Sequence, residues 1–470
     1  MNGSTTQPVE PHGHARGTLS DAPRGANIPP TRTSRHSQRG PRPRPWPEGG
    51  VEKLVIEHSG PLNGVVEISG AKNAALPILA ACLLTEEETV IERVPRVTDV
   101  LIMLQILGIL GVDVQWRGDQ LVITPGQYRG WTAPYELVSR MRASVCVLGP
   151  LLAKHGRARV SMPGGCVIGP RPIDLHLKGL QALGATMTVD HGDIVTHAER
   201  LCGTTIYLAG AFGSSVLATA NVMMAATLAE GTTVIEHAAC EPEVVDLAGF
   251  LISMGATISG HGTPRLVIEG VLRLHGTQHR IIADRIEAGT FMIATAAVGG
   301  DVKVLGANTE HLGLVVEKLR EANADVEVLS GALRIRSTRD TNAVDITTLP
   351  FPGFPTDLQA QMMALMAVSR GVSLITEKIY PERFMHVPEL RRMGAQITRE
   401  GPSAIVKGAE GLSGAPVTAS DLRASAALVI AGLVAENRTE LFGIEHLDRG
   451  YEGLEQKFVN LGGRIHRERG

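Results

Sequence analysis

Six times along the chain, a polar helix ends with an apolar residue and a tight turn at glycine or asparagine, and the residues that follow alternate between apolar and polar. These steps recur roughly every 70 residues. They lie at Leu110-Gly111-Val112, Leu183-Gly184-Ala185, Met254-Gly255-Ala256, Ala322-Asn323-Ala324, Met393-Gly394-Ala395 and Leu461-Gly462-Gly463. A glycine or asparagine just past a helix supplies a left-handed C-cap, and alternation is typical of a strand. Each repeat is therefore predicted to contain an amphipathic helix, a tight turn and a strand.

Each repeat also contains a second helix that is apolar on almost every side. These helices have short polar starts, and they begin near Lys72, Arg142, Ser215, Ile286, Thr356 and Leu422. A helix without a polar face is a buried helix. Strand-like runs such as Thr233-Val234-Ile235-Glu236 follow. The pattern predicts an α/β fold with helices inside and sheets outside.

Six repeats are too many for one hydrophobic core of ordinary size, so we expect two domains of three repeats. The first turns of the buried helices would then face a cleft between the domains. Such helix starts carry free N–H groups and the positive end of the helix dipole. We therefore expect anion-binding positions along this cleft.

Composition narrows the classes of function. The 470 residues carry a formal net charge of -3 and only 3% aromatic residues, which argues against a nucleic-acid-binding surface. The chain has no apolar run long enough to cross a membrane and no secretory signal. The five cysteines lack metal-ligand and disulfide spacing. We expect a cytoplasmic protein without a membrane or nucleic-acid partner, in which Cys82, Cys146, Cys202 and Cys240 are small apolar fillers.

The first 50 residues differ from the rest. They contain nine of the 27 prolines, seven arginines and three acids. Such a segment buries too little apolar surface to fold. We expect residues 1–50 to form a disordered tail that is dispensable for activity, with a polyanion-binding arm or a transit peptide as the alternatives.

Cations recur at related positions of the repeats, at helix starts or just after strands. They are Lys72, Arg142, Arg285, Arg383, Arg423 and Arg449. Cations that converge on one cleft favour a ligand carrying phosphate and carboxylate groups. In the alternative interpretation, each arginine pairs with a nearby acid: Asp284 with Arg285, Asp421 with Arg423 and Asp448 with Arg449.

The most distinctive loop runs from Met162 to His176. Three glycines and three prolines lie around Cys166 and Arg171 in it. A nearby arginine favours the thiolate form of a cysteine, so we expect the thiol of Cys166 to be exposed and its pKa to be lowered. The sequence therefore indicates a reactive cysteine at position 166.

Several long motifs occur together: Ser69-Gly70-Ala71-Lys72-Asn73-Ala74-Ala75-Leu76-Pro77, Pro163-Gly164-Gly165-Cys166 through Arg171-Pro172-Ile173-Asp174-Leu175-His176, Phe354-Pro355-Thr356-Asp357-Leu358-Gln359-Ala360-Gln361, Arg383-Phe384-Met385-His386-Val387-Pro388-Glu389-Leu390 and Asp421-Leu422-Arg423-Ala424-Ser425. With them the chain resembles the enolpyruvyl transferase family from Val51 to its C-terminus. Within that family it resembles the UDP-N-acetylglucosamine 1-carboxyvinyltransferases.

The resemblance implies two inverse α/β barrel domains, each with three repeats, pseudo-threefold symmetry, helices inside and sheets outside. One domain would comprise residues 51–71 and 283–470, and the other residues 72–282 with the Cys166 loop. The implied reaction transfers enolpyruvate from phosphoenolpyruvate to the 3-hydroxyl of UDP-N-acetylglucosamine and releases phosphate. It requires neither a metal nor an organic cofactor, and it opens peptidoglycan synthesis.

The resemblance also implies roles for individual residues. Cys166 would be the general acid and the target of epoxide inhibitors of the fosfomycin type. Asp357 would be the base, provided that burial raises its pKa. Phosphoenolpyruvate would contact Lys72, Asn73, Arg171 and Arg449. UDP-N-acetylglucosamine would contact Asn73, Arg142, Arg171, Pro172, Ile173, Asp174, Leu175, Ser215, Val216, Asp357 and Ile379. Supporting residues would be Arg383, Asp421 and Arg423.

One position departs from the family pattern. Ser215-Val216-Leu217-Ala218-Thr219 has a leucine where the family usually has a glycine beside the nucleotide diphosphate. Leu217 would either crowd the diphosphate or point away from it. Three other functions stay open: an enolpyruvyl transferase acting on shikimate 3-phosphate, a non-catalytic paralogue that binds UDP-sugars, and an RNA-end-modifying enzyme of related architecture.

Overall fold

The computed structural model describes residues 52–126, 130–162, 173–211 and 213–469. The expected tail, residues 1–50, lies outside the described residues, and so do Cys166, Arg171 and Pro172. What the sequence predicts for these residues therefore stays a prediction.

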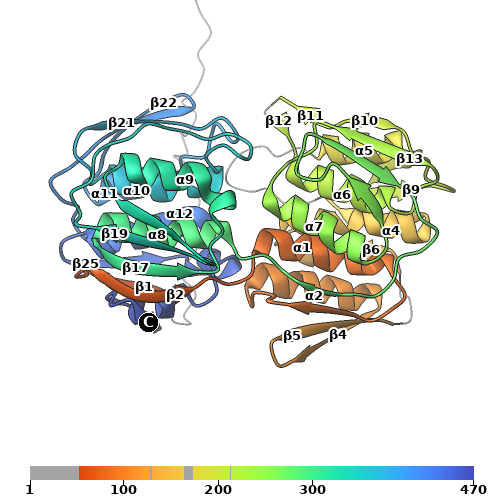
Figure 1. Ribbon diagram of the computed structural model, residues 1–470, viewed down its shortest axis with the longest axis horizontal. Helices are drawn as coiled ribbons and strands as arrows, with labels where there is room; N and C mark the ends of the chain where they lie inside the picture. Colours follow the sequence, from red (N-terminus) through yellow and green to blue (C-terminus); the bar gives the residue numbers. More distant parts are fainter. Residues whose placement is uncertain (1–51, 127–129, 163–172, 212, 470) are drawn as a thin grey trace, which may run out of the picture. The chain divides into compact units, whose positions relative to one another are not determined.

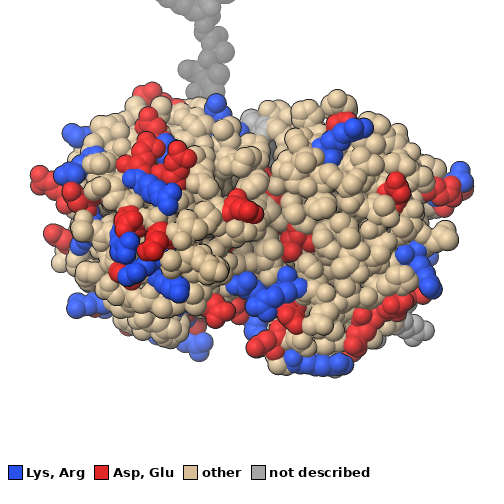
Figure 2. Space-filling view, viewed as in Figure 1, with Lys and Arg blue, Asp and Glu red and all other residues tan. Residues whose placement is uncertain are grey.

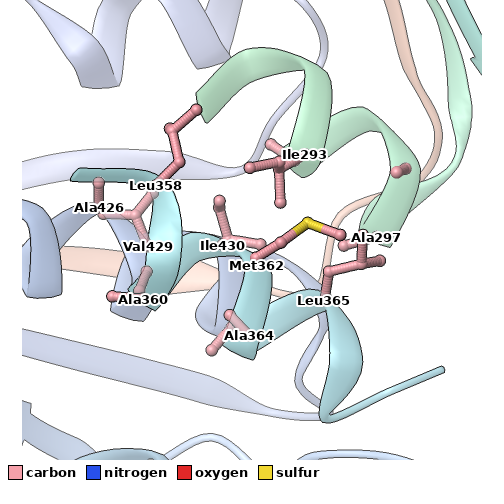
Figure 3. Packing of buried hydrophobic residues seen from close by; sticks show 14 of the residues in the cluster. Ile293, Ala297, Leu358, Ala360, Met362, Ala364, Leu365, Ala426, Val429 and Ile430 are labelled. Carbon is pink, nitrogen blue, oxygen red and sulfur yellow. The ribbon is translucent and has the colours of Figure 1, made fainter. Parts of the chain in front are cut away.

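The expected buried helices are present in all six repeats of the described chain, and almost every residue in them is buried. They are α1 (Lys72–Ala81), α4 (Leu148–His155) after the 3₁₀ turn η2 (Arg142–Val147), α6 (Val216–Ala226), α8 (Arg285–Val298), α10 (Gln359–Met366) after the 3₁₀ turn η3 (Thr356–Leu358), and α12 (Leu422–Val434). Side chains of α8, α10 and α12 interdigitate (Figure 3), among them Ile293, Met362 and Ile430. A Cβ atom on Gly289 would lie 2.3 Å from Cδ1 of Leu358, so α8 approaches η3 only because this residue is glycine.

The helix that precedes each turn is also present. These helices are α2 (Thr98–Leu110), α5 (Asp174–Ala182), α7 (Pro242–Ser253), α9 (Thr309–Glu321), α11 (Val387–Arg392) and α13 (Leu454–Asn460). The helix is amphipathic in every repeat but one: α2 has apolar residues on its exposed side as well, among them Leu101 and Ile109, so the prediction is wrong there. In α9, Leu312, Val315, Val316 and Leu319 form one buried stripe. The six turn residues that follow these helices all have positive φ, between 73° and 104°: Gly111, Gly184, Gly255, Asn323, Gly394 and Gly462. Each helix therefore ends at a left-handed residue, as predicted.

Three four-stranded sheets come from the N-terminal strands and the C-terminal part of the chain. Their strand orders are β2 (Leu62–Glu67), β17 (Gly300–Leu305), β19 (Ala332–Ser337), β18 (Asp325–Leu329); β20 (Ile346–Thr347), β21 (Val372–Thr376), β23 (Ser403–Lys407), β22 (Gln396–Glu400); and β24 (Pro416–Thr418), β25 (Arg438–Phe442), β1 (Glu52–Glu57), β26 (Ile465–Arg469). In each sheet the first pair is parallel and the other two pairs are antiparallel.

Three further sheets repeat this topology in the middle of the chain. Their orders are β16 (Gln278–Arg280), β3 (Thr89–Glu92), β5 (Gln120–Pro125), β4 (Val112–Arg117); β6 (Thr132–Ala133), β7 (Arg157–Ser161), β9 (Asp193–His197), β8 (Thr186–Asp190); and β10 (Thr205–Tyr207), β13 (Thr232–Glu236), β15 (Arg265–Glu269), β14 (Thr257–Ser259). The small remaining elements are the hairpin β11 (Ala209–Gly210) with β12 (Gly213–Ser214), helix α3 (Tyr135–Val138) and the 3₁₀ turns η1 (Cys82–Leu84) and η4 (Ile444–Arg449).

Two of these sheets join segments that lie far apart in the sequence. Strand β2 pairs in parallel with β17, and β16 pairs in parallel with β3. The buried apolar residues accordingly form two clusters. The C-terminal cluster runs from Leu54 to Ile68 and from Ile286 to Ile465, and the central cluster runs from Ala71 to Ile281. In Figure 1, β21 and β22 lie on one side of α10 and α12, and β1 and β2 lie on the other.

The sheets found among the described residues are separate, and none closes into a barrel. The mixed α/β class is thus confirmed, while the barrel description stays a prediction. Within the described chain, no helix combines the length and apolarity needed to span a bilayer. The face seen in Figure 2 carries acidic and basic side chains interspersed.

Candidate active site

A buried carboxylate joins two of the predicted cations. The Nζ of Lys72, the first residue of α1, lies 3.0 Å from Oδ2 of Asp99, and Nε of Arg449 lies 2.8 Å from Oδ1. The side chain of Asp99 is 3% exposed, whereas those of Lys72 and Arg449 are 10% and 32% exposed. Burial acts to raise the pKa of Asp99, but Lys72 and Arg449 outweigh it and keep this pKa below its usual value. This group therefore presents positive charge outward from an ionised anchor.

A second carboxylate has the opposite arrangement. Asp357 in η3 accepts a 2.7 Å hydrogen bond at Oδ1 from Nη1 of Arg383, and Nε of Arg423 lies 3.4 Å from Oδ2. Here the carboxylate is 26% exposed, and the side chains of Arg383 and Arg423 are 6% and 2% exposed. The guanidinium of Arg423 also lies 5.0 Å from the ring centre of Tyr451. This group presents negative charge outward from buried cations.

The pKa of Asp357 departs from the sequence-based expectation. Burial does act to raise it, as expected, but Arg383 and Arg423 together hold the pKa well below its ordinary value. The sequence-based expectation that the pKa of Asp357 is raised is therefore wrong, because the net shift is downward. Two buried guanidinium groups outweigh desolvation, so Asp357 is a carboxylate throughout the physiological pH range.

Asn73 connects the two carboxylate groups. Its Nδ2 lies 3.5 Å from Oδ2 of Asp357, and it follows Lys72 directly in α1. Lys72 also lies close enough to lower the pKa of Asp357. The structure thus brings together four of the six predicted cations, Lys72, Arg383, Arg423 and Arg449, with Asn73 and Asp357. Arg142 and Arg285 are not part of these ion pairs.

The alternative in which each arginine pairs with its neighbouring acid is wrong. The side chain of Asp284 caps α8, and Asp421 caps α12 by accepting from the backbone N–H groups of Arg423 and Ala424. Asp448 pairs with Arg467, and Arg285 pairs with Glu243 at 2.9 Å. A residue adjacent in sequence to an arginine is poorly placed to meet its long side chain, so distant acids take these positions.

The expectation of free N–H groups at the buried helix starts is only partly met. Side-chain caps occupy the starts of α6, α8 and α12, where Ser215, Asp284 and Asp421 accept from the first turn. Helix α1 begins after Ala71, which supplies no side-chain cap. Among the described residues, no side chain caps this helix start, which lies next to the presented cations and so is the one that best fits the expected anion-binding position.

The other predicted positions lie apart from these ion pairs. Arg142 begins η2 and lies near His176, whose pKa falls to about 3 because it is buried and close to that cation. Ile173 and Asp174 lead into α5 with Leu175, and Ser215 and Val216 start α6. Leu217 is partly buried against the central cluster. The backbone N–H of Ile379 donates to Oε1 of Glu377 at 2.8 Å.

Sequence reasoning missed Asp99 and Glu377. Asp99 lies in the first turn of an apolar helix, where an acid is ordinarily read as stabilising the helix dipole. Glu377 follows β21 and is fully buried. A charged residue directly after an apolar strand was the available signal for Glu377, because a buried charge requires partners.

The cysteine expectation holds in part. Cys82 and Cys146 are buried, and burial raises the pKa of each thiol, that of Cys146 to about 12. Cys240 is partly buried, and Cys202 is exposed. The apolar-filler interpretation is wrong for Cys202, because its side chain is exposed to solvent and not packed in the core. Its backbone forms an isolated β-bridge with that of Glu230.

Solved structures share this fold. The enolpyruvyl transferase NikO from Streptomyces tendae matches with a TM-score of 0.80 at 24% identity, covering 90% of this chain and 100% of that one. An EPSP synthase from Acinetobacter baumannii matches with a TM-score of 0.68 at 17% identity, covering 89% of this chain and 100% of that one. The fold is that of the enolpyruvyl transferases.

Sequence relatives define the family. The profile of EPSP synthase (3-phosphoshikimate 1-carboxyvinyltransferase) matches residues 56–458. UDP-N-acetylglucosamine 1-carboxyvinyltransferases from Methylacidiphilum infernorum and Myxococcus xanthus are 55% and 52% identical, each over 89% of this chain and 99% and 100% of their own lengths. The chain belongs to the EPSP synthase family and, within it, to the UDP-N-acetylglucosamine 1-carboxyvinyltransferases.

Proposed function

We propose that this protein transfers the carboxyvinyl group of phosphoenolpyruvate to the 3-hydroxyl of UDP-N-acetylglucosamine, as the first committed step of peptidoglycan synthesis in the cytoplasm. One observation carries the proposal: relatives that bear this activity in their names are 50–55% identical over 99–100% of their length. The two oppositely arranged carboxylate groups support it, because the reaction needs both an anion site and a base.

The anion site is built around Asp99. Lys72 and Arg449 are fixed by this carboxylate and face outward, and they bind the phosphate and carboxylate groups of phosphoenolpyruvate. Arg171, outside the described residues, joins them by resemblance. Fixed cations stabilise the charge that develops on the leaving phosphate without needing to reorganise during the reaction.

The base is Asp357. The 3-hydroxyl oxygen of the sugar forms a bond to C2 of phosphoenolpyruvate, and its proton passes to the carboxylate. The lowered pKa makes Asp357 a weak base. A weak base suffices here, because an alcohol proton becomes strongly acidic while its oxygen bonds to carbon, and Asp357 is already ionised.

Cys166 completes the addition by giving its proton to C3 of phosphoenolpyruvate, so that a tetrahedral phosphate-bearing ketal forms. C3 then loses a proton, the C2–O bond to phosphate breaks, and phosphate leaves as the carboxyvinyl ether forms. This chemistry uses neither a metal nor an organic cofactor. Neither nucleic acid nor a membrane takes part.

The UDP-sugar binds beside this site. We assign its contacts to Arg142, to residues 171–175, to Ser215 and Val216, and to Ile379 beside Asp357. The repeated sheet topology and the long-range pairings of β2 with β17 and of β16 with β3 support two domains, residues 51–71 with 283–470 and residues 72–282. Each domain is an inverse barrel of three repeats.

Phosphate release tests the function. We expect inorganic phosphate from phosphoenolpyruvate with UDP-N-acetylglucosamine as acceptor and none with shikimate 3-phosphate. Release with shikimate 3-phosphate alone would identify a different transferase. Binding of UDP-N-acetylglucosamine without phosphate release would identify a non-catalytic paralogue. Activity only on RNA ends would contradict the transferase function and the paralogue alternative.

Cysteine variants test the proton donor. Cys166→Ala should lose both turnover and labelling by a fosfomycin-type epoxide, while Cys166→Asp should keep turnover and resist the epoxide. Asp357→Ala should still be labelled. The matched control is Cys202→Ala, which removes an exposed thiol. Labelling that disappears in Cys202→Ala instead would contradict the assignment.

A further inference from the structure

Glu377 is a fully buried carboxylate that four hydrogen bonds hold in place. Its Oε1 accepts from Oγ1 of Thr348 at 2.6 Å and from the backbone N–H groups of Ile379 and Tyr380 at 2.8 and 2.9 Å. Its Oε2 accepts from Oγ1 of Thr356 at 2.9 Å. A buried charge is costly unless it is fully hydrogen-bonded, so this carboxylate fixes the groups around it as firmly as they fix it.

The bond at Oε2 leads directly to Asp357. The Thr356 hydroxyl donates its only proton to Glu377, so its oxygen is left as an acceptor. Nη1 of Arg383 donates to that oxygen at 3.0 Å and to Oδ1 of Asp357 at 2.7 Å. A continuous chain of hydrogen bonds therefore runs from Glu377 through Thr356 and Arg383 to Asp357.

The bonds at Oε1 act on the other side of the same site. They hold the backbone at Ile379 and Tyr380, just before Arg383. The carboxylate thus connects two segments to which the proposed function assigns contacts with the acceptor sugar. One segment carries Asp357 and the other carries Ile379 and Arg383.

We propose that Glu377 is a positioning residue that orients Asp357, through the Thr356 hydroxyl and the Arg383 guanidinium, for proton transfer from the acceptor hydroxyl. The inference rests on the proposed function and adds a residue to it. Glu377 touches no substrate. It fixes the direction in which the Thr356 hydroxyl points. That direction holds the Arg383 guanidinium, and with it the carboxylate of Asp357, in a single orientation.

Replacement of Glu377 by glutamine separates its two oxygens. An amide oxygen in the place of Oε1 keeps the bonds to Thr348, Ile379 and Tyr380, so the backbone segment stays anchored. The amide NH₂ in the place of Oε2 is a donor, and it turns the Thr356 hydroxyl away from its present direction. Glu377→Gln therefore reverses the hydrogen bond between residue 377 and the Thr356 hydroxyl, which disturbs the link to Asp357 while preserving the loop.

The test measures kcat and both KM values by phosphate release. Glu377→Gln should lower kcat by about 100-fold, the scale of a misplaced catalytic group, and leave the KM for phosphoenolpyruvate nearly unchanged. Thr356→Val should lower kcat to a similar extent, again with little change in the KM for phosphoenolpyruvate. Thr356→Ser, which keeps the hydroxyl, should have a kcat near that of the wild type. Because both changes break one chain, the double variant Glu377→Gln/Thr356→Val should be no slower than Thr356→Val.

The matched control is Thr348→Val, which removes a hydrogen bond from the other oxygen of Glu377. It should lower the urea midpoint without a comparable loss of kcat. If the losses of kcat in the two single variants multiplied in the double variant, the positioning role would be overturned. A Glu377→Gln variant that is less stable but turns over normally would overturn it too, and both results would leave the proposed function standing. A wild-type protein that releases no phosphate with UDP-N-acetylglucosamine would overturn the proposed function, and the positioning role with it.

Discussion

Asp99 and Asp357 are both carboxylates held between two cations, yet they face the solvent in opposite ways. At Asp99 the acid is buried and Lys72 and Arg449 are the more exposed partners. At Asp357 the acid is the more exposed partner and Arg383 and Arg423 are buried. Each group consists of one carboxylate and two cations, and the order of burial is reversed between them.

The order of burial decides what each group offers to a ligand. A buried anchor fixes its partners and is shielded from solvent, so the outer partner sets the local chemistry. The Asp99 group offers cations suited to phosphate and carboxylate, and the Asp357 group offers a carboxylate suited to a hydroxyl proton. One type of ion pair thus supplies both halves of an addition reaction.

The largest expected effect comes from removing the presented anion. Asp357→Asn should lower turnover by about 1,000-fold, within the range for loss of general acid-base help. It also leaves two buried guanidinium groups without a carboxylate, so the free energy of unfolding should fall by about 3 kcal/mol. Phosphate release and urea unfolding measure these effects. The control Asp340→Asn removes an exposed partner of Arg370 and should change neither, and normal turnover of Asp357→Asn would refute its role as the base.

Removing a presented cation should act on the other substrate. Lys72→Met keeps the apolar stem and removes the charge, so the KM for phosphoenolpyruvate should rise by about 100-fold, as for a lost charged hydrogen bond. The KM for UDP-N-acetylglucosamine should change much less. Lys318→Met, which breaks a surface pair with Glu321, is the control. Equal increases in both KM values would show that Lys72 does not select phosphoenolpyruvate.

Acid should lower the free energy of unfolding through two buried histidines, His176 in the central part of the chain and His386 in the C-terminal part. Burial lowers the pKa of His176 to about 3 and that of His386 to about 4, from an ordinary value of 6.5. Because the folded pKa is below the unfolded one, this stability is complete above pH 6.5 and is lost as the pH falls below it. Each histidine should cost ~2 kcal/mol at pH 5 relative to pH 7.

Urea unfolding at pH 7 and pH 5 measures this loss. In His176→Gln the loss between the two pH values should shrink by ~2 kcal/mol. The exposed His261 serves as the control, and His261→Gln should behave like the wild type. An unchanged pH dependence in His176→Gln would mean that His176 does not stay neutral in the fold.

The smallest effect is expected at Leu217, the one departure from the family pattern. Its side chain packs against the central cluster, so Leu217→Gly should lower the free energy of unfolding by about 1 kcal/mol. The affinity for UDP-N-acetylglucosamine should not change. Isothermal titration checks this, and tighter binding by the glycine variant would show that Leu217 crowds the diphosphate.

The repeats were predictable because their signals are local. A buried helix, a left-handed turn residue such as Gly255 or Asn323, and an alternating strand are each encoded within a few residues. The pairing of β2 with β17 is not encoded in this way, because more than 200 residues separate the two strands. That exchange was available only through the family resemblance.

The same distinction applies to the site. The motifs around Lys72, Asp357 and Arg423 are contiguous, so their residues could be named from the sequence. Asp99 is 27 residues from Lys72 and 350 from Arg449, and no local pattern connects them. Reasoning from neighbours instead assigned Asp448 to Arg449, which is wrong, because the fold turns Asp448 towards Arg467.

The central claim concerns the order of burial in the Asp99 and Asp357 groups. Because the cations are the more exposed partners in the first and the carboxylate in the second, the first group should attract an anionic ligand and the second should repel it. Isothermal titration of phosphoenolpyruvate alone, without acceptor, into the wild type, Lys72→Met and Asp357→Asn tests it most directly. Lys72→Met should bind about 100-fold more weakly. Asp357→Asn should bind at least as tightly as the wild type, since it removes a negative charge near the anion site although it does not turn over. A loss of affinity in Asp357→Asn as large as that in Lys72→Met would contradict the account.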